Sequence, residues 1–186
     1  MDLWRTYHGT YKYSSIVFDG PEIDLDNNGT KHNDLTKELH FDGVEDEEHY
    51  FYFYSSGIDA MYYSATDEHR LYCIATIQFP FQPLVYNGHS YEIDRKFSLC
   101  GTLDAVIWID VRTGKFYIPE TFGIVYPYEG RDFDRFVIPS LQIGTDLMIE
   151  EGKISFKMKC SFYDFSSSSF VRGWVYANLV RPPKRR

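Results

Sequence analysis

The chain contains few cysteines, an excess of acidic over basic residues and no long apolar run. Its three cysteines have no C-x-x-C spacing, so a zinc site built from cysteine pairs is not expected. Lys and Arg total 19 against 27 Asp and Glu, a net charge of −8, which argues against a general nucleic-acid binder because such proteins present a basic surface. No stretch approaches the roughly 18 apolar residues of a membrane helix. The first residues also lack the charged and apolar regions of an export signal, so we expect any such signal to be missing from this chain.

The cysteines fit a structural role better than a chemical one. Cys73, Cys100 and Cys160 each lie in or beside an apolar, strand-like run, where a cysteine is typically a small buried hydrophobic residue. One disulfide plus a free thiol is the alternative. Three cysteines neither establish nor exclude an oxidising compartment.

Helical periodicity is nearly absent, and the best helical segment is the short stretch 34–39. Aromatic residues reach 18% of the chain, with 16 Tyr and 15 Phe, and they favour strands. Roughly ten to twelve short strands, with turns every 8–12 residues, predict an all-β antiparallel fold, either a lipocalin-like barrel or a β-sandwich. We expect a single β domain over residues 1–186, with an acidic insert at about 19–47. The lone Gly173 in the last strand indicates a bulge or a close approach of another group.

The strands are expected at 7–17, 48–55, 58–65, 71–79, 84–86, 90–97, 103–111, 115–118, 147–150, 153–162 and 170–180. The short runs at 122–126 and 136–138 are flanked by prolines, which suits edge strands or irregular loops.

The insert contains the sharpest motif of the sequence, D-x-D-x-N-G-x, at residues 24–30. Calcium needs six to eight oxygen ligands, and alternate side chains of such a loop can converge on one point. Asp24, Asp26 and Asn28 occupy the side-chain positions, Gly29 permits the sharp turn, and Thr30 offers its backbone carbonyl. We call residues 24–38 the acidic loop.

The end of the acidic loop departs from an EF-hand, because the twelfth position is Leu35 rather than glutamate. Asp34 or Glu38 must then complete the ligand shell, and His32, at the ninth position, can face solvent. A structural calcium site is the prediction. The alternative is an Asn/Asp-rich turn without a metal, since D-N-N-G makes good turns.

Residues 9–39 resemble the opening of the lipocalin-like lipoproteins of Bacteroidota. In that family a first strand beginning G-T-W/Y leads into a D-x-(D/N)-x-D-G loop followed by (T/N)-D-L-x-x-E-L. Here the strand start corresponds to Gly9, Thr10 and Tyr11, and the loop pattern to Asp24, Asp26, Asn28, Gly29, Asp34, Leu35, Glu38 and Leu39. The resemblance implies an antiparallel barrel or open barrel, export to the cell envelope and no established catalysis. It also implies membrane attachment through a lipid anchor, and we expect that anchor to be absent from this chain.

The aromatic segment 48–55 offers a candidate ligand surface. Tyr50, Tyr52 and Tyr54 fall on one face of the expected strand, and Tyr62 continues the cluster in the next strand. Tyrosine presents a flat apolar body with a polar tip, which suits a sugar or a protein surface. Cross-strand pairing that simply stabilises the sheet is the alternative.

Catalytic motifs are weak, since the sequence has neither a G-x-S-x-G elbow nor a phosphate-binding P-loop. Asp104 and Asp110 share a strand face but lie about 20 Å apart, too far to act on one bond. Glu92 and Asp94 lie about 7 Å apart on one face, a distance that suits an inverting glycosidase. A solvated face is the simpler interpretation of that pair.

These features predict a non-enzymatic binding module of the cell envelope or the extracellular space. It would contain structural Ca²⁺ and bind a small apolar or glycan ligand. Two alternatives remain open: a structural or interaction protein, such as a virion component or an inhibitor of a partner protein, and a small glycan-active β-fold enzyme.

Overall fold

A computed structural model of the chain describes eight stretches of residues. Within β2, β3, β6 and β7, defined below, the description covers the backbone and almost none of the side chains. The described stretches are 11–38, 61–63, 70–80, 82–94, 100–110, 112–113, 115–117 and 146–181.

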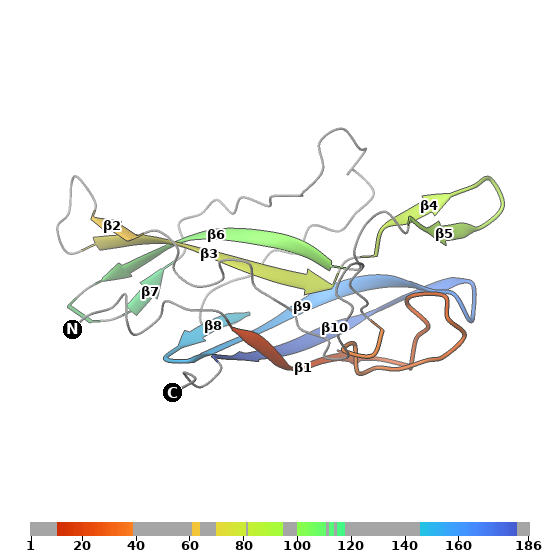
Figure 1. Cartoon of the computed structure of the whole chain (residues 1–186), viewed down its shortest axis with the longest axis horizontal. Helices are drawn as coiled ribbons and strands as arrows, with labels where there is room; N and C mark the ends of the chain where they lie inside the picture. The colour runs from red at the N-terminus through yellow and green to blue at the C-terminus, as the bar shows by residue number, and fades with distance from the viewer. Residues whose placement is uncertain are drawn as a thin grey trace, which may run out of the picture.

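The described part of the chain contains ten strands in three antiparallel sheets and no helix (Figure 1). The first sheet, which we call the terminal sheet, has the order β1 (Lys12–Asp19), β10 (Ser169–Val180), β9 (Lys153–Asp164) and β8 (Leu147–Glu150). The second, the central sheet, has the order β2 (Met61–Tyr63), β3 (Arg70–Pro80), β6 (Cys100–Asp110) and β7 (Lys115–Tyr117). A separate hairpin joins β4 (Leu84–Tyr86) to β5 (Tyr91–Ile93).

The all-β prediction is therefore confirmed, and none of these sheets closes into a barrel within the described residues. Asp34 forms a bridge with Val17 and residues 35–38 form turns, so the short helical segment expected at 34–39 does not appear in its described part, 34–38. The strand predicted at 48–55 lies outside the described residues, as do the short runs at 122–126 and 136–138.

The long hairpin of β9 and β10 follows directly from its alternating sequence. The two strands pair residue for residue from Ser169 opposite Asp164 to Val180 opposite Lys153. Along β9 the apolar Ile154, Phe156 and Met158 are buried, while the residues between them are more exposed. A half-buried antiparallel strand shows this period of two because successive side chains point to opposite faces.

The glycine in β10 is explained by close packing. Phe18 of β1 is fully buried, and a Cβ built on Gly173 would lie 2.7 Å from its ring and 2.8 Å from the carbonyl oxygen of Asp19. The register of β9 and β10 runs through Gly173 without a bulge. Of the two expectations for this glycine, the close approach is the correct one.

The core lies on one face of the terminal sheet and includes aromatic contacts such as Phe18 against Phe162, with ring centroids 5.5 Å apart. Cys160 belongs to this core as a free cysteine, and burial raises its pKa to about 12. The prediction of a small buried hydrophobic residue is thus confirmed for Cys160. The side chains of Cys73 and Cys100 lie outside the described part of the structure.

Candidate metal centre

The acidic loop leaves β1 and returns to it along the same edge. Ile23 and His32 form an antiparallel bridge in which each backbone N–H donates to the other residue's carbonyl, at 3.2 and 3.0 Å. Beyond the bridge, the N–H of Phe18 donates to the carbonyl of Asn33 at 2.8 Å. The returning segment therefore covers part of the free edge of β1, which would otherwise expose unpaired backbone groups.

Apolar side chains fix the base of the loop. Ile23, Leu25 and Leu35 are fully buried and belong to the core of the terminal sheet. Leu25 sits between Asp24 and Asp26 in the chain and is buried in the core, while both aspartate carboxylates lie close to that of Glu38. Leu35, the residue that breaks the EF-hand pattern, is an anchor of the loop.

Backbone hydrogen bonds also tie the loop to the turn between β9 and β10. The N–H of Asp24 donates to Oδ1 of Asp164 at 3.0 Å, and the N–H of Phe165 donates to the carbonyl of Asp24 at 3.0 Å. Burial opposes ionisation of Asp164, but hydrogen bonds from Ser167, Asp24 and Ser166 outweigh it and lower its pKa to about 2. Asp164 is thus an ionised residue that holds two distant segments together.

Gln82 makes a second connection and is almost fully buried. Its Nε2 donates to the carbonyls of Leu25 and Tyr163 at 2.9 and 2.8 Å, and its Oε1 accepts from the N–H of Tyr163 at 2.7 Å. The side-chain amide therefore pairs with the backbone N–H and carbonyl of Tyr163 as a neighbouring strand would, and it also bonds to the backbone of the acidic loop at Leu25.

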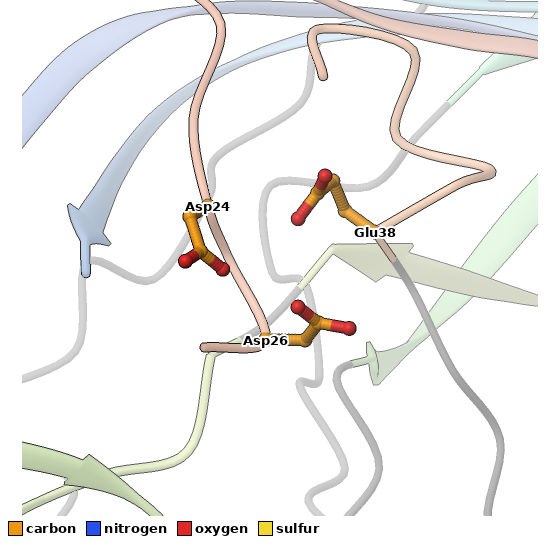
Figure 2. A group of neighbouring side chains, drawn as sticks. All are labelled: Asp24, Asp26 and Glu38. Atoms are coloured by element: carbon orange, nitrogen blue, oxygen red, sulfur yellow. The ribbon is translucent and has the colours of Figure 1, made fainter. Parts of the chain in front are cut away.

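Three carboxylates of the acidic loop converge at its centre. One carboxylate oxygen from each of Asp24, Asp26 and Glu38 lies within 4.8 Å of the others. Figure 2 shows the three carboxylate groups turned toward a common space, with Glu38 reaching in from the end of the loop. Only 2%, 8% and 0% of these residues are exposed, respectively.

A tight turn supplies backbone donors to the two aspartates. The N–H of Asn28 donates to Oδ1 of both Asp24 and Asp26, at 3.1 and 3.0 Å, and the N–H of Gly29 donates to Oδ2 of Asp24 at 3.0 Å. Asn27 and Gly29 both adopt positive φ, 61° and 86°, a conformation that asparagine and glycine tolerate best. The positive φ values of Asn27 and Gly29 therefore accompany the turn that aims the N–H groups of Asn28 and Gly29 inward.

The remaining predicted ligands are not among the three converging carboxylates. Asn28 is exposed and turns its Oδ1 toward Thr30, accepting from that residue's N–H and hydroxyl, while its Nδ2 donates to Asp26 at 2.9 Å. Thr30 is exposed as well. Asp34 caps its own turn by accepting from the N–H and the hydroxyl of Thr36. Of the two residues expected to complete the shell, the structure brings Glu38, not Asp34, beside the aspartates.

Glu38 is held from two sides and is electrostatically costly when ionised. Its Oε2 accepts from the N–H of Leu25 at 2.8 Å, and its Oε1 lies 2.5 Å from Nδ1 of His32. Burial raises the pKa of Glu38, the two hydrogen bonds lower it, and the negative charge of Asp26 raises it again, with a net upward shift. His32 thus contacts Glu38 through Nδ1, while its side chain, at the ninth position, remains 32% exposed.

The arrangement is chemically suited to a hard divalent cation. Carboxylate oxygens are the preferred ligands of Ca²⁺, Mg²⁺ and Mn²⁺, and each oxygen can accept an N–H while still offering a lone pair. Three carboxylates do not by themselves distinguish among these ions.

Among the described residues, no other sequence candidate belongs to such a converging group. Tyr50, Tyr52 and Tyr54 lie outside the described residues, and of Tyr62 only its backbone position in β2 is described. Glu92 is exposed and accepts a hydrogen bond from Nδ2 of Asn87. Its proposed partner Asp94 is half-buried, and the N–H of Asp94 donates to the carbonyl of Pro83.

Asp110, which was predicted to share a strand face with Asp104, forms an ion pair. Arg112 Nη2 lies 2.9 Å from Oδ2 of Asp110, and the hydrogen bond from this guanidinium lowers the pKa of Asp110 to about 2. Asp104 lies in β6, where its side chain is outside the described part.

Sequence reasoning missed Gln82 and Asp164, the two residues that join the loop to the β9–β10 hairpin. Asp164 did carry a signal, because an aspartate followed by serines is typical of an Asx turn, and its Oδ1 accepts from the N–H of Ser166 at 3.1 Å. Gln82 carried no such signal, since its role depends on contacts with Leu25 and Tyr163, which lie 57 and 81 positions away in the chain.

No family model, curated protein or solved structure matches this chain. Among the described residues, no helix is long and apolar enough to cross a membrane.

Proposed function

We propose that the protein is a non-catalytic binding module whose acidic loop takes up a structural divalent cation, with Ca²⁺ as the best candidate. The observation that carries this proposal is the convergence of Asp24, Asp26 and Glu38, three buried carboxylates, within 4.8 Å. Without a cation, their like charges repel one another in a poorly solvated place. A bound divalent ion would replace that repulsion by attraction.

A structural role suits the way the site is built. Both oxygens of Glu38 already contact other parts of the loop, and the backbone of Asp24 is bonded to the β9–β10 turn. A cation here would therefore link the two ends of the loop and strengthen its attachment to the terminal sheet. The preference for Ca²⁺ over Mg²⁺ rests on the D-x-D-x-N-G spacing, because calcium accepts the irregular, many-oxygen shell that such a loop can provide.

The rest of the functional proposal rests on composition and on the resemblance of residues 9–39 to lipocalin-like lipoproteins. We propose that the sheets belong to an open lipocalin-like barrel or a sandwich and that the module acts at the cell envelope or outside the cell. Its ligand would be a small apolar or glycan molecule. The aromatic excess of the chain supports this ligand class.

Calorimetric titration of CaCl₂ into protein stripped with a chelator tests the metal site. We expect binding of one ion, its loss in Asp24→Asn and Glu38→Gln, and unchanged binding in Asp19→Asn. Asp19 is a matched control because it is an exposed aspartate at the end of β1, before the loop begins. Folding of each variant is checked by circular dichroism.

Two results would overturn the metal proposal: no heat and no thermal shift at millimolar Ca²⁺ for folded wild-type protein, or equal weakening by Asp19→Asn and Asp24→Asn. A parallel titration with MgCl₂ examines the choice of ion. Binding of Mg²⁺ as tight as that of Ca²⁺ would contradict the calcium assignment while leaving the site itself in place.

A further inference from the structure

The terminal sheet has a second face, opposite its core, which we call the outer face. Because side chains alternate along a strand, β10 presents Arg172, Trp174, Tyr176 and Asn178 there. The partners of the last three across β9 are Lys159, Lys157 and Ser155, and their partners across β1 are Asp19, Val17 and Ser15.

Exposed apolar side chains concentrate on the outer face. The described part of the chain has seven exposed large hydrophobic residues, of which five lie on this face by strand register. The five are Val17, Met148, Phe170, Tyr176 and Val180. Tyr176 is 44% exposed, although it is an aromatic residue in the middle of a four-stranded sheet. Val17 and Tyr176 are cross-strand partners, so two of the five lie side by side, and adjoining exposed apolar side chains are typical of an interaction site.

Cations accompany the aromatic residues. The Nζ atoms of Lys157 and Lys159 lie 5.3 and 5.2 Å from the ring centroid of Trp174, within the range of a cation–π interaction. Strand register also places Lys12, Lys153 and Arg172 on the outer face.

Acidic groups are fewer on this face. Asp19 and Glu150 share it by register, and Asp146 lies 3.8 Å from Lys157. The outer face thus has a modest positive excess in a chain whose net charge is −8.

We infer that the outer face binds a glycan that carries carboxylates, of the uronic-acid class, an inference that rests on the binding-module proposal and names its ligand. A pyranose ring has an apolar face that can lie on Trp174 or Tyr176, as amphipathic aromatic rings permit. Its carboxylate would pair with Lys157 or Lys159. Its hydroxyls would meet the polar side chains of Ser155 and Asn178.

The charge balance favours this ligand over a denser polyanion. Nucleic acid carries a charge on every nucleotide and is bound by domains with a strongly basic surface. The outer face has only a small positive excess, and the remainder of the protein would repel such a strand. A glycan with one carboxylate per two sugars requires less compensation, and the neutral serine and asparagine side chains match its hydroxyls.

The test uses a fluorescently labelled hyaluronan octasaccharide, which alternates carboxylated and neutral sugars, and measures anisotropy at low salt with Ca²⁺ present. Lys157→Ala combined with Lys159→Ala should weaken binding at least tenfold. Trp174→Ala should have a similar effect, and Trp174→Phe should retain most of the affinity. Raising NaCl from about 50 to about 200 mM should weaken binding severalfold, since exposed charges are screened.

A matched control lies away from the outer face. Lys31→Ala combined with Lys37→Ala removes two exposed lysines of the acidic loop. This change should alter the affinity less than twofold. Thermal unfolding verifies that every variant is folded.

Four outcomes would overturn the inference. The first three are no binding of the octasaccharide, equal loss of affinity in the two lysine double variants, and equal affinity for the octasaccharide and its methyl ester. The fourth is tighter binding of a twelve-residue oligothymidylate, of poly-glutamate or of a sulfated heparin octasaccharide than of the hyaluronan octasaccharide. Calcium titration of the same outer-face variants separates the two proposals. If these variants bind Ca²⁺ but the wild type binds no glycan, only the present inference fails.

Discussion

The acidic loop and the outer face of the terminal sheet place charge in opposite settings. In the loop, three carboxylates are buried within 4.8 Å of one another, and backbone N–H groups and His32 surround them. On the outer face, lysines of β9 lie over an aromatic ring beside water, with carboxylates nearby. Because buried charges interact more strongly and are screened less, changes in the loop region should alter stability far more than changes on the outer face.

The largest expected effect comes from Gln82, which connects the loop to β9. Gln82→Leu would leave the carbonyl of Leu25 and both backbone groups of Tyr163 without their partner, at about 1–3 kcal/mol for each buried group. We expect the free energy of unfolding to fall by roughly 3–5 kcal/mol in a urea titration. Asn87→Ala, an exposed amide in the β4–β5 turn, serves as the control and should cost well under half of that. A loss below about 1 kcal/mol for Gln82→Leu would show that Gln82 is not an important connection.

Calcium should produce the next largest effect. A ligand that binds only the folded state adds about 2.7 kcal/mol at one hundred times its dissociation constant. For a chain of this length, that corresponds to a rise in Tm of roughly 5–10 °C. Differential scanning calorimetry with and without a chelator measures the shift. An equal shift in Asp24→Asn would place the calcium effect outside the acidic loop.

How far the sequence predicted this loop depends on the range of the interactions involved. Asp24 and Asp26 were identified because their spacing is a local pattern, and the strands at 153–162 and 170–180 followed from local alternation. The choice of Glu38 over Asp34 was not predictable, since it depends on which carboxylate the buried Leu35 leaves facing the loop centre. Gln82 was missed for the same reason, because its partners are distant in the chain.

The pH dependence of stability tests the contribution of Asp164, a buried charge beside the acidic loop. Its folded-state pKa of about 2 lies below the ordinary value of 3.8, so its ionised form stabilises the fold. That stability is present above the unfolded-state pKa and is lost as the pH falls from about 4 toward 2. Asp164→Asn should therefore cost roughly 2 kcal/mol at pH 7 and little at pH 2, measured by urea unfolding at several pH values. A cost that is equal at both pH values would assign the effect to packing or to neutral hydrogen bonds.

Glu38 should respond to pH with the opposite sign. Burial raises its pKa, so the protonated form favours folding, and its contribution to stability is lost as the pH rises through the folded-state pKa. Without calcium, Glu38→Gln should thus be at least as stable as wild type at pH 7, because the amide oxygen can still accept from the N–H of Leu25. With calcium, the wild type should become the more stable protein. Thermal unfolding at pH 5 and pH 7, with and without CaCl₂, tests this reversal, and a variant that is less stable under all conditions would contradict it.

The smallest effect on stability is expected on the outer face, and a large effect there would contradict the contrast between the two regions. The ion pair of Lys157 with Asp146 spans 3.8 Å between partly exposed side chains, and such pairs contribute about 0–1 kcal/mol. Its cation–π contact with Trp174 adds about 0.5–1 kcal/mol at an exposed site. The two contributions sum to about 0.5–2 kcal/mol, so Lys157→Ala should lower the free energy of unfolding by about 1 kcal/mol, and high salt should shrink the difference. A larger, salt-insensitive loss would mean that this lysine acts through the packing of its aliphatic stem, and the contrast between a buried, charge-sensitive loop and a tolerant sheet face would no longer hold.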